Sequence, residues 1–288
     1  MKTIDSRTRI QLANILFATD FSPAADAAIP YAAGLAKRFG AKLYAINVRP
    51  ISMGPLMMPG GDGGAAEAAK VDAEYKTEQI LAMFRELKPE VLIAEGAIWP
   101  NIADTVDEHD IDLIVLGTRG RSGVAKLLLG SVAEEIFRKA CCPVLTVGPH
   151  SQAKFDPAEI LKILFATDLT PQSLAAPYAI SLAQEYQAHL TLLYVSEPGD
   201  VVHLSHSAEL LYNLVPEEAG LWCEPEFIVE PGDVAETILN VAARQQADLI
   251  VIGARSNGGS PGLQAHLPAT VAHKIVCGAA CPVLTVRA

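Results

Sequence analysis

The sequence lacks a long apolar run, and it lacks an apolar segment near its start. Half of its 288 residues are hydrophobic, yet no stretch reaches the ~18 consecutive apolar residues that a membrane-spanning helix needs. The opening residues, MKTIDSRTRI, do not contain the apolar core of a signal sequence, so we expect no export signal. These absences predict a cytoplasmic protein that does not insert into a membrane.

Cysteine is also scarce. The five cysteines are Cys141, Cys142, Cys223, Cys277 and Cys281. They are too few and too unevenly spaced for a disulfide framework, which favours a reducing compartment. Cys142 and Cys281 each precede a proline at matching places in the chain. We interpret both as small buried apolar residues, with a redox or metal role as the alternative.

Positive charge is in deficit. The 33 acidic residues outnumber the 22 basic ones, and the formal net charge is −11. Nucleic acids and anionic membranes attract basic surfaces, so we expect neither as a main partner. An anionic ligand would have to be held by a local feature that overcomes the negative field of the whole chain.

Three segments, in contrast, occur twice in the same order. They are ILFATD at Ile15–Asp20 and Ile163–Asp168, DLIVLG at Asp112–Gly117 with DLIVIG at Asp248–Gly253, and CPVLTV at Cys142–Val147 and Cys281–Val286. Because the copies lie about 140 residues apart, the period is too long for a solenoid, and each copy should be a complete domain. We predict domains at 1–149 and 161–288, joined by a linker at 150–160.

Each copy alternates short β-branched runs with longer helical patterns, which is typical of βαβ units around a parallel sheet. We predict strands near 14–19, 42–48, 91–95, 111–117 and 143–147, and again near 162–167, 189–195, 226–230, 248–253 and 282–286. In the first copy we predict helices near 23–39, 65–87, 99–109 and 130–140. Ser22 followed by Pro23 marks the first helix start, and Gly40 its end.

The two copies differ between their second and third strands. The section Ser196–Pro225 contains no convincing counterpart of the long helix predicted at 65–87. In the first copy, this helix is preceded by a segment rich in Pro, Gly and Met, at Met53–Gly64. We interpret the segment as a flexible connector, with a lid over a ligand as the alternative.

The most informative stretch of the first copy runs from Gly117 to Ser131. Ligands of open α/β sheets bind beyond the carboxyl ends of the strands, which is where Gly117 lies. Gly120 allows close approach of the backbone to a ligand. Gly130 and Ser131 open the next helix, whose unpaired N–H groups and dipole attract an anion. Ser131 also stands three residues before Glu134, which fits a capping box.

Charged residues support an anion site here. Arg119, Arg121 and Lys126 fall within one loop of an acidic protein, although a solvated basic loop would have the same composition. Asp20 ends the first strand at the same edge. Its carboxylate can accept hydrogen bonds from ribose hydroxyls or a base amino group, or it can form a turn before the helix.

The pattern G-x2-G-x9-G-[ST] is met by Gly117, Gly120, Gly130 and Ser131. With Thr-Asp ending the first strand and Cys-Pro-Val opening the last, this pattern resembles the universal stress protein family over nearly the whole chain. The resemblance implies two tandem open-sheet α/β domains, each a five-stranded parallel sheet of order 3-2-1-4-5 flanked by helices. It also implies ATP as the cofactor, with Mg or Mn accompanying the triphosphate in some members; this sequence offers no dedicated ligand set for a metal ion.

By position, the resemblance implies a nucleotide site in the first domain. Asp20 and the backbone of Val48 would meet the nucleoside, while the glycines of the pattern would hold ribose and phosphates. The expected binding residues are Ala18, Thr19, Asp20, Val48, Gly117, Arg119, Gly120, Gly130, Ser131 and Val132. Since members of this family pair through their last strands, we also expect the two domains to form an intrachain pseudo-dimer, and a homodimer of chains is a further expectation.

The second copy departs from this pattern. The equivalent positions are Asp168, Val195, Gly253, Ser256, Ala269 and Thr270. Two pattern glycines are thus replaced, by Ser256 and Ala269, and three residues are inserted between them. A side chain at a position that needs φ > 0 costs ~1–2 kcal/mol or forces another loop shape. We therefore predict weak or no ATP binding by the second domain.

An ATP-binding stress or regulatory protein is the function that these features favour. The sequence contains no P-loop G-x4-G-K-[ST] and no general base beside the expected cradle. We therefore expect at most slow ATP hydrolysis or autophosphorylation. A nucleotide-free scaffold is one alternative. An adenylyl-transfer enzyme on a related fold is another, although its usual H-I-G-H or S-G-G-x-D-S sequences are absent. A dehydrogenase fits less well, because G-T-R-G-R-S-G is not G-x-G-x-x-G.

Overall fold

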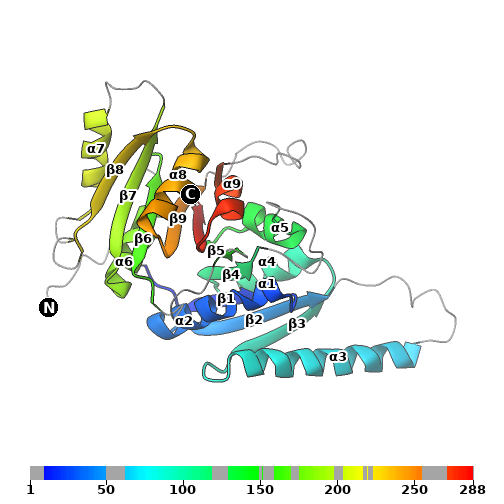
Figure 1. Ribbon diagram of the computed structural model, residues 1–288. Helices are drawn as coiled ribbons and strands as arrows, with labels where there is room; N and C mark the ends of the chain where they lie inside the picture. The colour runs from blue at the N-terminus through cyan, green and yellow to red at the C-terminus, as the bar shows by residue number, and fades with distance from the viewer. Residues whose placement is uncertain are drawn as a thin grey trace.

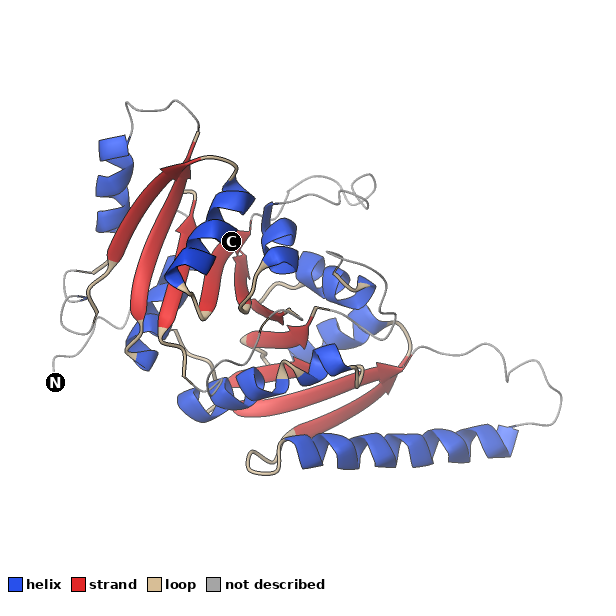
Figure 2. Ribbon diagram, in the orientation of Figure 1, coloured by secondary structure: helices blue, strands red, loops and turns tan. Residues whose placement is uncertain are grey.

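The computed structural model describes residues 10–49, 62–118, 129–148, 151, 159–169, 175–197, 204–216, 219, 223–254 and 271–287. In this part of the chain, strands from both halves form one extended sheet with helices against its two faces (Figure 1). Figure 2 shows the strands running continuously through the molecule between the helical layers.

The first half carries β1 to β5 and α1 to α5. Its strands are β1 (Asn14–Ala18), β2 (Lys42–Arg49), β3 (Glu90–Glu95), β4 (Leu113–Gly117) and β5 (Val144–Val147). Its helices are α1 (Pro23–Asp26), α2 (Ile29–Phe39), α3 (Asp62–Met83), α4 (Ile98–Glu108) and α5 (Ser131–Lys139). The strands agree closely with the predicted ranges, because strands covered on both faces are continuous apolar runs.

The second half repeats this arrangement. Its strands are β6 (Lys162–Thr167), β7 (His189–Ser196), β8 (Glu226–Pro231), β9 (Leu249–Ala254) and β10 (Val283–Arg287). Its described helices are α6 (Ala175–Tyr186), α7 (Leu204–Asn213), α8 (Val234–Gln245) and α9 (Val271–Gly278).

The order across the sheet is β3-β2-β1-β4-β5-β10-β9-β6-β7-β8. From the seam outwards, the strands of each half follow the order 5-4-1-2-3, which is the predicted order 3-2-1-4-5 counted from the other edge. All strand pairs within a half are parallel. The predicted fold class is confirmed for each half. The structure joins the two five-stranded sheets into one continuous sheet.

The two halves join through their last strands. β5 and β10 pair antiparallel, with Val283 opposite Thr146, Leu284 opposite Leu145 and Thr285 opposite Val144. This pairing is the intrachain pseudo-dimer that the sequence predicted, with the CPVLTV segments at its centre. Because it covers the outer edges of both last strands, a homodimer of chains would have to use another surface, and it stays a prediction.

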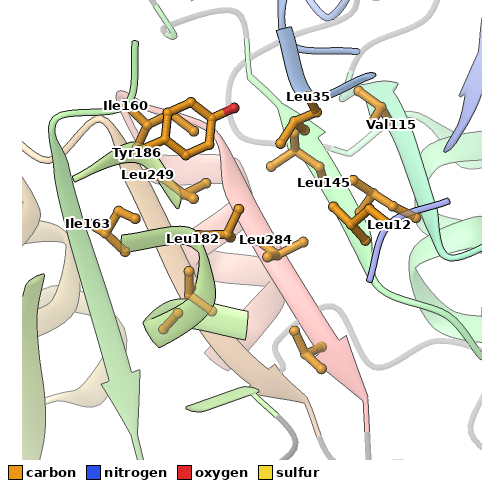
Figure 3. Packing of buried hydrophobic residues seen from close by; sticks show 14 of the residues in the cluster. Leu12, Leu35, Val115, Leu145, Ile160, Ile163, Leu182, Tyr186, Leu249 and Leu284 are labelled. Carbon is orange, nitrogen blue, oxygen red and sulfur yellow. The ribbon is translucent and has the colours of Figure 1, made fainter. Parts of the chain in front are cut away.

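Two apolar layers hold the helices against the sheet, and each layer includes residues of both halves. One contains Phe17 and Phe165 with α2 and α6, and the other contains Leu16 and Leu164 with α4, α5, α8 and α9. Figure 3 shows Leu12, Leu35 and Leu145 of the first half facing Leu182, Leu249 and Leu284 of the second, across the seam. The domains therefore share a core as well as a sheet.

Two helix predictions were inaccurate. The range 23–39 is divided into α1 and α2, because Pro30 lacks an N–H and its ring clashes with the carbonyl of the preceding turn. The expected ends are present: the Ala25 N–H donates to Ser22 Oγ (3.2 Å), and Gly40 ends α2 with φ 65°. In the second half, α7 occupies the place of α3 as a shorter helix, where we had expected no convincing counterpart. Of the predicted connector, the first nine residues lie outside the described residues, and the rest begin α3.

Candidate functional site

A pocket opens in the first half at the carboxyl ends of β1, β2 and β4. It encloses about 670 Å³ between protein atoms, part of it open to solvent. Its lining is Ala18, Thr19, Asp20, Ala25, Ile46, Val48, Ile102, Leu116, Gly117, Gly130, Ser131, Val132, Ala133 and Ile136. Eight of the residues predicted from the sequence are in this list: Ala18, Thr19, Asp20, Val48, Gly117, Gly130, Ser131 and Val132.

The end of β1 forms one rim of the pocket through a tight turn. The Phe21 N–H donates to Thr19 Oγ1 (3.0 Å), and the Ser22 N–H donates to Asp20 Oδ1 (3.0 Å). Phe21 takes a positive φ of 57° within this turn. The Asp20 side chain is exposed, so it forms the turn and still presents a carboxylate oxygen to the pocket. Both sequence interpretations of Asp20 are compatible with this geometry.

The N-terminus of α5 forms the opposite rim. Its N-cap is Gly130, which as a glycine has no side chain that could cap the helix. The backbone of Gly130 is extended, with φ −60°, so the expectation that this pattern glycine needs a positive φ was wrong. The first helical bond runs from the Glu134 N–H to the Gly130 carbonyl (2.8 Å), so the N–H groups before Glu134 have no partner within the helix. The predicted capping box was wrong, because Ser131 is the first helical residue rather than the cap. Its side chain is exposed at the pocket mouth.

β4 and α5 are joined directly at this rim. The Gly130 N–H donates to the carbonyl of Thr118, the residue that follows β4 (2.7 Å). The helix start is thereby fixed to the end of a buried strand, and its residues Gly130, Ser131 and Val132 line the pocket. A helix N-terminus of this kind attracts an anion.

Gly117 is required for packing in this pocket. A Cβ built on Gly117 would lie 2.1 Å from the Ala24 carbonyl oxygen and 2.8 Å from the Ala25 nitrogen. The backbones of β4 and α1 therefore approach each other more closely than any side chain allows. The sequence motif predicted only a ligand contact for this glycine, and its close approach to α1 was not predicted.

The inner wall is apolar and includes residues that the sequence analysis did not identify: Ala25, Ile46, Ile102, Leu116, Ala133 and Ile136. Ile46 could have been found, since it shares a strand face with Val48 two residues away. Ile102 lies on α4, and no pattern in the sequence places this helix beside β2. An apolar wall beneath a polar rim suits a ligand with a flat apolar part and a charged part.

Of the other predicted site residues, only some belong to the part of the chain that the structure describes. Arg119, Gly120, Arg121 and Lys126 lie outside the described residues, as do Ser256, Ala269 and Thr270 of the second copy. At the second site, Asp168 and Gly253 are exposed and Val195 is half-buried at the corresponding strand ends. The Leu169 N–H donates to Thr167 Oγ1 (3.1 Å), and Leu169 has a φ of 58°. The second copy has thus kept the turn that follows the first strand.

The described residues also bear on metal binding, membrane insertion and the state of the cysteines. Among them, no three His, Cys, Asp or Glu side chains gather closely enough to hold a metal ion. No helix in that part of the chain is both long and apolar enough to cross a bilayer. Cys281 is buried, as predicted, whereas Cys142 is half-buried. Desolvation raises the pKa of both thiols to about 12, which is typical of unreactive packing cysteines.

Known proteins resemble the chain in sequence and in structure. The family model described as "Universal stress protein family" matches residues 12–148 and again 159–287. A universal stress protein of Methanocaldococcus jannaschii is 33% identical over 138 residues, which cover 46% of this chain and 80% of that protein. One from Mycolicibacterium smegmatis is 26% identical over 294 residues and covers 95% of this chain and 96% of its own.

A solved structure shares the whole architecture. The crystal structure of a universal stress protein from Archaeoglobus fulgidus matches with a TM-score of 0.72 at 19% identity. The match covers 96% of this chain and 99% of that one. At this identity the likeness establishes the fold of the two joined domains.

Proposed function

Because the chain belongs to the universal stress protein family, we propose that it binds ATP in the pocket of its first domain and that nucleotide occupancy regulates its contacts with other molecules. The observation that carries this proposal is the juxtaposition of Asp20, Val48 and the N-terminus of α5 around one pocket. These are the positions at which the sequence predicted contacts to the nucleoside and to the phosphates.

Each part of ATP has a matching part of the pocket. The adenine ring would lie against the apolar wall of Ile46, Val48 and Ile102, and the ribose hydroxyls would donate to Asp20. The phosphates would accept hydrogen bonds from the unpaired N–H groups at the start of α5. Arg119, in the loop between β4 and α5, would add positive charge beside Gly120.

The pocket suits a metal ion only as a companion of the phosphates. The rim supplies one carboxylate, Asp20, and one of its oxygens already accepts the Ser22 N–H. Magnesium prefers octahedral oxygen coordination and commonly binds through one or two carboxylates together with substrate phosphates and water. A Mg or Mn ion would therefore be held chiefly by the triphosphate.

The second domain is proposed to bind ATP weakly or not at all. It keeps the turn at Thr167–Leu169, but Ser256 and Ala269 replace pattern glycines. Its role would then be to pair with the first domain along the β5–β10 seam.

Calorimetric titration with ATP tests this proposal. Wild-type protein should bind about one ATP per chain. Gly130→Asp sets a carboxylate at the N-cap, where Asp is a favourable residue, so the fold should be retained. A unit charge about 5 Å from a phosphate, at an effective dielectric of about 20, opposes binding by roughly 3 kcal/mol, or more than a hundredfold.

The matched variant is Ala269→Asp in the second copy, which should leave ATP affinity nearly unchanged. Equal losses from the two substitutions would contradict the assignment to the first domain. Failure of the wild-type chain to bind adenine nucleotide would favour a scaffold that acts through its surface. Mass spectrometry of molecules released from purified protein by heating gives an independent check.

A further inference from the structure

We propose that Arg287, at the end of β10 in the second domain, is a positioning residue for the phosphate end of the first domain's pocket. The inference rests on the proposed function, since it concerns how α5 is held at that site. It also explains what the second copy contributes to a pocket that lies wholly in the first.

Arg287 binds the C-terminal end of α5. Its guanidinium donates to the backbone carbonyls of Phe137 and Arg138, and it lies 5.7 Å from the centre of the Phe137 ring. Ile136 already has a partner, because its carbonyl accepts the Ala140 N–H (2.9 Å). The carbonyls of the last helical turn have no partner within a helix. The second domain therefore caps α5 with a cation, which is the charge that a helix C-terminus favours.

The arrangement is not reciprocal. In the sheet, Val147 lies opposite Gly117 and Val286 lies opposite Gly253, so the residue equivalent to Arg287 in the first domain is Gly148. A Cβ on Gly148 would lie 3.7 Å from the carbonyl oxygen of Ala279, just beyond α9. Position 148 thus faces the end of α9 as Arg287 faces the end of α5, but glycine provides no donor. Among the residues that the structure describes, the second domain supports the helix of the intact pocket, and Gly148 has no side chain to return the contact.

Arg287 acts on the pocket through the position of the helix. α5 has nine residues and is about 13 Å long, which exceeds the screening length of about 8 Å at physiological salt. Direct attraction between Arg287 and phosphates at the far end is therefore weak. A short helix fixed at both ends keeps its N–H groups in place, whereas a helix with a frayed last turn can shift on the sheet. The start of α5 is fixed to Thr118, and Arg287 fixes its end.

The substitution Arg287→Met tests this inference, because it removes the donors and keeps an unbranched side chain against Phe137. Arg287→Lys keeps the charge without the planar fork, and Gly148→Ala is the matched control on the other side of the seam. Affinity is measured for ATP by calorimetry and for adenosine, which lacks phosphates, by NMR titration. Amide hydrogen exchange follows the last turn of α5.

We expect Arg287→Met to weaken ATP binding about three- to tenfold and to leave adenosine binding within about twofold of wild type. Arg287→Lys should recover part of the loss, and Gly148→Ala should change neither affinity. Exchange in the last turn of α5 should accelerate in Arg287→Met.

Four results would overturn the inference. ATP affinity that is unchanged in Arg287→Met would leave the proposed function standing and remove the role of Arg287. An equal loss of affinity for ATP and adenosine in Arg287→Met would show that Arg287 is purely structural. The same conclusion would follow if the Arg287→Met chain does not fold while Arg287→Lys binds both ligands as wild type does. A wild-type chain that binds neither ligand would refute the proposed function together with the inference.

Discussion

Gly117→Ala tests the packing on which the pocket depends. The structure places the new Cβ 2.1 Å from the Ala24 carbonyl oxygen and 2.5 Å from the Ala24 carbonyl carbon. Ordinary contacts are about 3.5–4.0 Å, so β4 and α1 must separate by more than about 1 Å. Both atoms belong to the backbone, and neither can rotate away.

The magnitude follows from two opposing effects. Overpacking of this kind costs about 1–3 kcal/mol and occasionally more, and a clash with backbone belongs at the upper end. Replacing glycine by alanine also restricts the unfolded chain, which offsets about 0.4–1 kcal/mol. We expect a net loss of at least about 2 kcal/mol in the free energy of unfolding. ATP affinity should fall as well, because α1 follows the Asp20 turn.

Urea denaturation monitored by circular dichroism measures the loss. Gly148→Ala is the control, because its Cβ would meet its nearest atoms at 3.7–3.9 Å, which is ordinary contact. That variant should match or slightly exceed the wild-type stability. A Gly117→Ala chain within about 0.5 kcal/mol of wild type would show that β4 and α1 do not approach as described, and the local account of the pocket would fail.

Three further predictions concern the seam and the thiols. Thr146→Val should cost about 1 kcal/mol, because the Thr146 hydroxyl donates to the buried Val283 carbonyl (3.1 Å). Thr285→Val should be neutral or stabilising, because the buried Thr285 hydroxyl has no hydrogen-bond partner among the described residues; equal losses in denaturant titrations would contradict the asymmetry. A thiol reagent at pH 8 should label the exposed Cys141 rapidly and the half-buried Cys142 more slowly, and should leave the buried Cys281 unlabelled until the chain unfolds; rapid labelling of Cys281 would refute its burial. Since the Cys142 and Cys281 thiols both have a pKa of about 12 when folded, against an ordinary 9.0, they favour folding below pH 9, and that contribution should be lost as the pH rises towards 12.

The strands could be predicted from the sequence because parallel strands buried on both faces are apolar along their whole length. Repetition indicated two domains, and the resemblance to the universal stress protein family indicated the seam. The division between α1 and α2 was missed because Pro23 and Pro30 each fit a first helical turn, and the pattern alone did not show that the second one starts a new helix. α7 was missed because its section is short and weakly patterned.

The pocket was predictable where backbone chemistry determines it. Asp20 and Gly130 were found because strand ends and helix starts have their own residue preferences. Ile102 and Ile136 were not, since an apolar residue on a helix looks the same whether it lines a ligand or a core. The contact of Arg287 with α5 was also invisible, because it joins segments 149 and 150 residues apart.

A crystal structure of the chain grown with ATP tests the central claim most directly. We predict one nucleotide per chain, with adenine against Ile46 and Val48, ribose at Asp20, and phosphates at the N-terminus of α5. A first-domain pocket that stays closed to nucleotide, or equal occupancy of both domains, would contradict the claim.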